Sequence, residues 1–229
     1  MFKERSHKKE ILDGENIPDK DLFQNLKELD TINHLLGGYK ITFGALKKVL
    51  RNNKSYKIVD IGCGGGDTLK RIFNWSKKQK LNLELIGVDL KQTCIDYSKS
   101  NKPNPEIRFI QDDYRNIQSH LTKIDVIHAC LFCHHLSSKE ISELIQFAIE
   151  QNATLVINDL QRNWFAYYSI QFLTRIFSKS YLVKNDAPLS VLRGFKKLEL
   201  LDILQNSGAK NYTIRYKWAF RYEVIVYAK

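Results

Sequence analysis

Several features that would place the chain in a specialised class are missing from its sequence. Only 4 prolines and 11 glycines occur in 229 residues, which excludes a collagen-like or low-complexity chain. No apolar run approaches the roughly 18–20 residues of a membrane span, and the charged start MFKERSHKKE lacks the apolar stretch of a signal peptide. We therefore expect a cytoplasmic protein without a membrane span, whose 4 cysteines are thiols rather than disulfides.

What the sequence does contain favours a globular protein with an uneven distribution of charge. Hydrophobic residues make up 43% of the chain and aromatic residues 11%, which is enough for a buried core. The net charge is +11, and residues 161–229 account for +8 of it, with 12 basic and 4 acidic side chains, whereas residues 56–160 are neutral. This surplus fits a solvated basic face, an anionic ligand or partner, or nucleic acid, although dense Lys/Arg clusters are missing.

Short apolar segments alternate with helical patterns through the middle of the chain. This alternation predicts βαβ units and a parallel sheet that is buried on both faces. Near the carboxyl terminus, two alternating segments lie so close in sequence that they predict an antiparallel hairpin. The fold class predicted is α/β: a doubly wound, mostly parallel seven-stranded sheet with an antiparallel last strand. The expected strands are Tyr56–Ile61, Leu83–Val88, Ile107–Ile110, Ile124–Ala129, Thr154–Ile157, Lys210–Tyr216 and Phe220–Tyr227, with helices over 67–79, 91–100 and 138–150.

The two ends of the chain differ from this middle part. We expect residues 1–55 to form an N-terminal helical cap, with a loose polar arm over 1–20 and helices over 21–36 and 42–52. The main domain would span 56–229, with a lid inserted at about 160–195.

A glycine-rich turn follows the first strand in the sequence VDIGCGGGDTL. Gly62, Gly64 and Gly66 allow positive φ and let a ligand approach bare backbone. The dinucleotide motif G-x-G-x-x-G would need a glycine at position 67, which Asp67 occupies instead. The observed form is D-x-G-x-G-x-G, and the acid Asp60 suits a ligand with positive charge, such as an amine or a sulfonium. The alternative is a tight βα turn without a ligand.

Two further acidic positions follow the second and third strands. Asp89 ends the second strand, where a carboxylate binds ribose hydroxyls in doubly wound sheets; its alternative role is a cap for the next helix. In FIQDDY, Asp112 or Asp113 can accept from an adenine amino group, and Tyr114 can cover the ring.

Together these motifs resemble class I S-adenosylmethionine-dependent methyltransferases. VDIGCGGG, GVDL, QDDY and IDVIHACLFCHHL are similar to the four motifs of that family, in order, over residues 56 to 160. The resemblance implies the Rossmann-like methyltransferase fold and S-adenosyl-L-methionine as cofactor. It also implies a set of cofactor-binding residues, which comprises Asp60, Gly62, Cys63, Gly64, Gly66, Asp89, Leu90, Asp112, Asp113, Tyr114 and Cys130.

The segment Cys130-Leu131-Phe132-Cys133-His134-His135 also matches a haem-attachment string and offers four zinc ligands. We expect neither metal nor haem, because the cysteines leave a buried strand and no second Cys pair occurs. By resemblance this is the loop after the fourth strand, which places His134 or His135 toward the acceptor. We name His134 as the candidate catalytic base and His135 as substrate-binding; the alternative is that a histidine only caps the next helix.

The region after the fifth strand supplies the predicted acceptor contacts. Trp164 to Val183 forms an aromatic, apolar helix and predicts a lid for a flat or greasy acceptor. Ordinary core packing and an interfacial helix resting on a membrane are the alternatives. A polar turn over Asp186–Ser190 and Arg193 would follow. Trp164, Tyr168 and Arg193 are the predicted substrate-binding residues, with Arg193 orienting an anionic end.

The predicted function is methyl transfer to a hydrophobic small-molecule acceptor, by O-methylation of an aromatic or polyketide-like compound. The ends of the chain resemble bacterial methyltransferases found beside polyketide-type biosynthetic enzymes, which implies a role in small-molecule biosynthesis. The alternatives are an RNA methyltransferase and a C-methyltransferase of a quinone-like acceptor. We do not expect nucleic acid as a partner, and the sequence predicts no particular oligomeric state.

Overall fold

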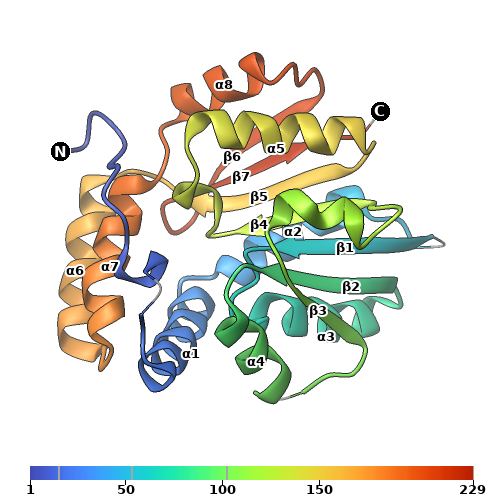
Figure 1. Cartoon of the computed structure of the whole chain (residues 1–229). Helices are drawn as coiled ribbons and strands as arrows, with labels where there is room; N and C mark the ends of the chain where they lie inside the picture. The colour runs from blue at the N-terminus through green and yellow to red at the C-terminus, as the bar shows by residue number, and fades with distance from the viewer. Residues whose placement is uncertain (15, 53, 102, 229) are drawn as a thin grey trace.

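The protein is a seven-stranded sheet with helices on both faces (Figure 1). A computed structural model describes residues 1–14, 16–52, 54–101 and 103–228. The strand order is β3-β2-β1-β4-β5-β7-β6, with β1 to β5 parallel and β7 antiparallel to both of its neighbours. This confirms the predicted fold class. The strands are β1 Ser55–Ile61, β2 Asn82–Asp89, β3 Ile107–Gln111, β4 Val126–Cys130, β5 Thr154–Leu160, β6 Tyr212–Lys217 and β7 Arg221–Val226.

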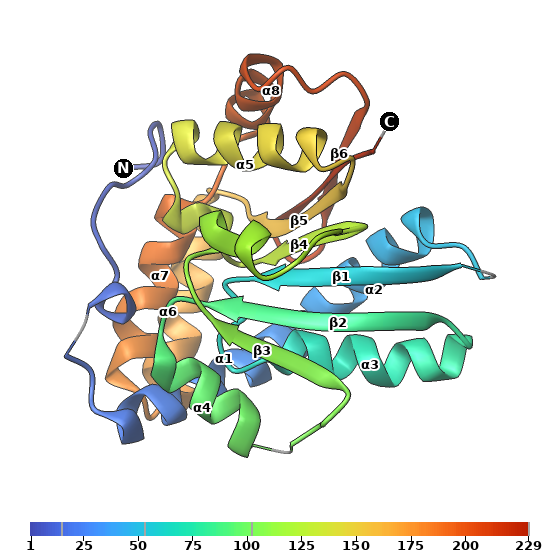
Figure 2. The ribbon, with the colours of Figure 1, turned by 45° about the vertical axis from the view of Figure 1, so that its right-hand side comes forward.

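Each face of the sheet has its own hydrophobic core. Ile58 belongs to a cluster with α2, α3 and α4, and the next residue, Val59, belongs to a cluster with α5 and α8. Side chains alternate along a strand, so a strand buried on both faces must be apolar throughout. Figure 2 shows α5 and α8 on one side of the sheet and α3 on the other. These helices are α2 Gly38–Val49, α3 Asp67–Gln79, α4 Gln92–Ser100, α5 Ser138–Glu150 and α8 Lys197–Asn206.

The region after β5 folds differently from the prediction. Two helices, α6 Trp164–Phe177 and α7 Tyr181–Arg193, replace the single helix expected over 164–183. Ser180 caps α7, because its side chain accepts from the backbone N–H of Val183. The polar turn predicted over Asp186–Ser190 is wrong: this stretch is part of α7 although Pro188 lies inside it. Local propensity disfavours a helix there, but burial of Leu182, Val183 and Pro188 outweighs it.

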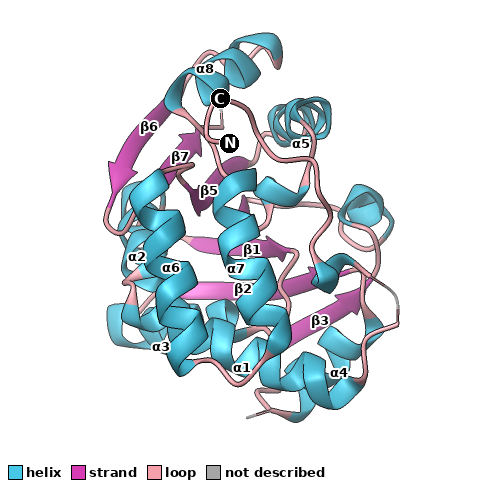
Figure 3. Cartoon of the chain, turned by 90° about the vertical axis from the view of Figure 1, so that its left-hand side faces the viewer, coloured by secondary structure: helices cyan, strands magenta, loops and turns pink. Residues whose placement is uncertain are grey.

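The amino-terminal arm is ordered rather than loose. Ser6 N donates to Leu192 O over 3.0 Å, and Arg162 donates to the carbonyls of Phe2 and Lys3. A short 3₁₀ turn, η1 Ile11–Asp13, and α1 Asp19–Leu35 complete the cover. Figure 3 shows α1, α6 and α7 in front of one end of the sheet. The arm and these helices therefore cover the edge at which the parallel strands end.

Two other expectations concern the whole chain. In the described ranges, no helix combines the length and the apolar character needed to cross a membrane. The domain boundary at residue 55 stays a prediction; in the structure, α2 lies before that boundary and packs against β5 and β7.

Candidate active site

A cleft of about 440 Å³ opens at the carboxyl ends of β1 to β4. This is the edge at which doubly wound sheets bind ligands, and the volume lies in the range of small-molecule sites. Most of the predicted cofactor-binding residues line the cleft: Gly62, Cys63, Gly64, Asp89, Leu90, Asp112, Asp113, Tyr114 and Cys130.

The glycine turn forms one wall of the cleft, and two of its glycines need their backbone freedom. Gly62 has φ of 62°, and a Cβ there would lie 2.1 Å from the ring of Phe132. Gly64 has φ of 51°, and its N–H donates to Asp89 Oδ2 over 2.8 Å. Both conformations are costly for a residue with a Cβ. The turn therefore presents bare backbone to the cleft.

Asp89 lies at the centre of this wall. Its Oδ1 accepts from the N–H of Lys91 over 3.0 Å, while Oδ2 holds Gly64. Burial raises the pKa of Asp89 above its ordinary value. Each carboxylate oxygen can accept a second hydrogen bond, so Asp89 can order the glycine turn and still bind a ligand hydroxyl.

The end of β3 supplies two paired acids. Asp112 Oδ2 lies 2.6 Å from His120 Nε2, and this contact lowers the pKa of Asp112. Asp113 is paired with Arg115, which likewise lowers its pKa. Tyr114 follows these two acids and packs edge-on against Phe132, with ring centroids 5.4 Å apart.

Cysteines form part of the cleft surface. All 4 cysteines are free thiols, and Cys63 and Cys130 line the cleft. Burial raises the pKa of Cys63 well above its ordinary value and that of Cys130 to about 11. Both are therefore neutral at physiological pH, and they contribute apolar surface rather than nucleophiles.

Two predicted cofactor-binding residues lie outside the cleft lining. Asp60 is buried, and its Oδ1 lies 2.6 Å from His128 Nδ1. His128 in turn contacts Thr42 Oγ1 through Nε2, at 3.1 Å. Gly66 is the N-cap of α3, and a Cβ there would lie 2.6 Å from Phe109. These residues lie below the cleft surface and support the turn.

The two neighbouring histidines of the β4 loop have different surroundings. His134 is buried, and its Nδ1 lies 2.7 Å from Asp159 Oδ1. His135 lines the cleft, and its Nδ1 lies 2.9 Å from Asp13 Oδ1. The structure therefore places His134, the predicted base, behind the wall of the cleft, whereas His135, the predicted substrate contact, faces the cleft.

The carboxylates beside these histidines are ionised. Burial alone would raise the pKa of Asp159, but the neighbouring His134 holds it below its usual range. His135 does the same for Asp13. An ionised carboxylate accepts only, so Nδ1 of each ring donates to it, and each Nε2 points away from that carboxylate.

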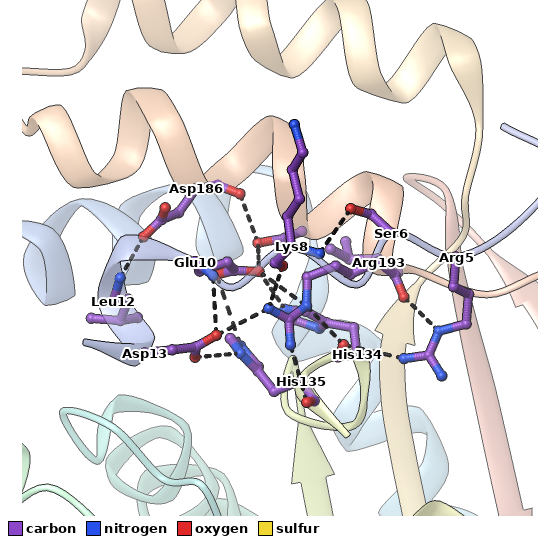
Figure 4. Close-up of polar contacts among 12 residues, drawn as sticks. Arg5, Ser6, Lys8, Glu10, Leu12, Asp13, His134, His135, Asp186 and Arg193 are labelled. Carbon is purple, nitrogen blue, oxygen red and sulfur yellow. Dashed lines mark hydrogen bonds and ion pairs between the residues drawn. The ribbon is translucent and has the colours of Figure 1, made fainter. Parts of the chain in front are cut away.

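Glu10 faces both of those Nε2 atoms (Figure 4). It is 4% exposed, and burial raises its pKa to about 7. Ser190 Oγ donates to Glu10 Oε1 over 2.8 Å.

Arg193 does not have the role predicted for it. It is 7% exposed, and it donates to the carbonyls of Lys8, His134 and His135 and to Asp13 Oδ2. The guanidinium therefore fastens the amino-terminal arm to the β4 loop, as Figure 4 shows, and it is not an open site for an anion.

The predicted aromatic contacts of the lid face solvent. Trp164 is 61% and Tyr168 54% exposed, and neither lines the cleft. They lie on the outer side of α6, because α7 occupies its inner side. Sequence pattern alone could not show which side of the helix would be covered.

Instead, part of the cleft lining comes from the amino-terminal region. Sequence reasoning missed these residues, since they lie before the recognised motifs and include no catalytic residue type at a diagnostic spacing. The apolar spacing of α1 was the one available signal. They are Leu12, Asp13, Leu26, Leu29, Asp30, Asn33 and Tyr39.

Comparisons with known proteins agree with this geometry. Residues 58–151 match the family described as a methyltransferase domain. This range, which is less than half of the chain, carries a methyltransferase domain. The match therefore supports methyl transfer as the activity of the chain. The matched range begins in β1 and ends after α5, so it contains the glycine turn, Asp89 and the β4 loop.

Solved structures resemble the methyltransferase in fold. The plantazolicin methyltransferase BpumL, in complex with SAH, is 21% identical, with 87% of this chain and 79% of that chain covered and a TM-score of 0.60. Human N-acetylserotonin methyltransferase, in complex with SAM, is 12% identical, with 92% of this chain and 56% of that chain covered and a TM-score of 0.63. The CMeT domain of the citrinin polyketide synthase is 13% identical, with 82% of this chain and 52% of that chain covered and a TM-score of 0.56. The comparison with curated proteins gives no match.

Proposed function

We propose that this methyltransferase transfers a methyl group to an oxygen of a mostly apolar small molecule, of an aromatic or polyketide-like type. One observation carries the proposal: the cleft is rich in carboxylates and otherwise largely apolar. Its lining contains two basic side chains, Lys91 and Arg115, and seven acidic ones: Asp13, Asp30, Asp67, Asp89, Asp112, Asp113 and Glu140. Such a surface attracts a cationic cofactor and repels a phosphate backbone.

The residues present fit the cofactor. The bare backbone at Gly62 and Gly64 admits a ligand where a Cβ would fill the space, and Asp89 retains free acceptor capacity for ribose hydroxyls. Asp112, Asp113 and Tyr114 lie at the next strand end for the adenine. When bound, S-adenosylmethionine supplies an activated methyl group. The chain's own residues then contribute mainly by orienting the acceptor and excluding water, which accounts for much of the rate in such reactions.

The acceptor would lie against the wall formed by Leu12, Phe132, His135 and Leu136. Of the two histidines in the β4 loop, we assign His135 to the acceptor, because its ring lines the cleft while Asp13 fixes its orientation. His134 would lie behind the cleft wall and hold the β4 loop in place through its hydrogen bonds to Asp159.

The test is methyl transfer from labelled S-adenosylmethionine to a panel of phenols and aromatic polyketide-like compounds, with product structures determined by mass spectrometry and NMR. We expect an O-methylated product. His135→Asn should lower kcat at least tenfold, with the affinity for the cofactor unchanged, while His34→Asn, an exposed histidine of α1, serves as the control. Methylation of carbon alone would favour the C-methyltransferase alternative, and turnover with RNA but with no small molecule would overturn the proposal.

A further inference from the structure

Glu10, His134 and His135 bring three metal-ligating atoms together at the back of the cleft. A carboxylate oxygen and the two Nε2 atoms all lie within 4.8 Å of one another. Glu10 and His134 are buried and His135 is partly buried. Figure 4 shows the three side chains converging from the amino-terminal arm and the β4 loop. We propose that these residues bind one divalent transition-metal ion through two imidazole nitrogens and one carboxylate.

The distances from the Glu10 carboxylate to the two rings fit a shared ion better than direct hydrogen bonds. His134 Nε2 lies 3.6 Å from Glu10 Oε1, and His135 Nε2 lies 3.9 Å from Glu10 Oε2. Hydrogen bonds of this kind measure roughly 2.7–3.2 Å. Two ligands that are each bound about 2.1 Å from one metal ion lie roughly 3–4 Å apart.

Each histidine is oriented as a metal-binding histidine usually is. Asp159 holds Nδ1 of His134 at 2.7 Å, and Asp13 holds Nδ1 of His135 at 2.9 Å. A carboxylate on Nδ1 directs the lone pair of Nε2 toward the metal and makes the ring a better ligand. Ser190 similarly orients Glu10 from behind. Two imidazoles and one carboxylate favour zinc or ferrous ion over magnesium.

Arg193 does not take the place of an ion at Glu10. It approaches Glu10 only to 4.0 Å and is engaged mainly with Asp13 and backbone carbonyls.

The ion would fasten the arm to the β4 loop and expose a free coordination position on the side of His135, which lines the cleft. An acceptor oxygen could then bind to the metal rather than to His135 itself. That role of the ion rests on the proposed function, whereas its binding does not. This proposal departs from the expectation of no metal. The sequence pattern offered His134 and His135 only together with Cys130 and Cys133, and Glu10 lies far from them along the chain and has no motif of its own.

The test uses full-length protein without a histidine tag, stripped with EDTA and titrated calorimetrically with zinc chloride, in the absence of cofactor and acceptor. We expect one zinc ion per wild-type chain, an increase in Tm on binding, and no binding of magnesium at the same concentration. Glu10→Gln and His134→Asn should weaken zinc binding at least tenfold. His34→Asn and Cys133→Ser should not, since neither residue belongs to the cluster.

Glu10→Gln keeps the volume and an acceptor for Ser190, so circular dichroism should show a folded protein whose Tm no longer responds to zinc. Asp159→Asn, which alters the partner of His134 but none of the three ligands, should weaken binding less than His134→Asn. The proposal fails if the wild type binds neither zinc nor ferrous ion stoichiometrically. It also fails if both ligand variants keep full affinity, or if Cys133→Ser abolishes binding. Because no turnover is measured, these outcomes are independent of the methyl acceptor.

Discussion

At the scale of single residues, burial decides which chemical groups can act at the cleft. Cys130 is the last residue of β4, and its thiol is held neutral by desolvation. Asp89 is half-buried, and two backbone N–H groups stabilise its carboxylate. Both residues lie at strand ends, but their chemical roles differ because the hydrogen-bond partners of the two side chains differ.

Cys130 should react slowly with thiol reagents in the native protein. It is the one partly exposed cysteine, and burial raises its pKa to about 11, so that at pH 8 roughly one thousandth is thiolate. Its reaction with Ellman's reagent should accelerate as the pH rises from 8 toward 10, because deprotonation generates the nucleophile. The variant Cys130→Ser lacks this thiol, so the reaction that it loses is the reaction of Cys130. Rapid, pH-independent labelling of Cys130 in folded protein would contradict this assignment.

At the scale of elements, α7 fixes the amino-terminal arm and thereby completes the cleft. Asp186 accepts from the N–H groups of Ile11 and Leu12, each over 2.9 Å, and these bonds hold η1 beside the cleft. Ser190 and Arg193, each about one turn further along α7, bind Glu10 and Asp13. One face of α7 therefore organises residues from the start of the chain.

Replacing Asp186 with alanine should destabilise the protein. Hydrogen bonds to a charged group contribute about 1.5–3 kcal/mol each, and two are lost, so we expect the free energy of unfolding to fall by about 3–6 kcal/mol. Urea denaturation measures this, and limited proteolysis should show faster cleavage in residues 1–14. Asp202→Ala, at an exposed position of α8, is the matched control and should change stability by less than about 0.5 kcal/mol. Equal stability of the two variants would rule out the fastening role.

Local patterns predicted the sheet because strands and turns are encoded locally. The segment around Ile58 and Val59 is apolar on both faces, which specified a buried parallel strand, and glycines marked the turn that follows. The contacts of Glu10 and Arg193 could not be predicted in this way, since they join residues far apart in the chain. The break between α6 and α7 was also missed, because the aromatic pattern continues across Ser178 and Ser180.

At the scale of the whole molecule, one helix exposes large apolar side chains that the core does not cover. The outer side of α6 exposes several large side chains, among them Trp164, Phe165, Phe172 and Phe177, at 53–75%. Ordinary core packing, one of the alternatives for this helix, therefore does not describe these rings. Contiguous exposed apolar surface often marks an interaction site, and peripheral membrane contact stays a prediction for this helix.

Because Phe172 is 64% exposed, Phe172→Ser should leave the free energy of unfolding within about 0.5 kcal/mol of the wild type. Phe195 is 1% exposed, and Phe195→Ala should cost about 3–5 kcal/mol. Chemical denaturation of both variants makes the comparison. A large loss of stability in Phe172→Ser would mean that this side of α6 is covered in solution.

The most direct test of the account is calorimetric titration of S-adenosylmethionine into the wild type and Asp89→Ala, with Asp96→Ala as an exposed control on α4. A bond to a charged group contributes about 1.5–3 kcal/mol, so we expect one site per chain and an affinity at least tenfold weaker in Asp89→Ala alone. Circular dichroism verifies that the variant is folded. Equal affinity in all three proteins would remove Asp89 from the cofactor site, and preferential binding of a nicotinamide dinucleotide by the wild type would contradict the account as a whole.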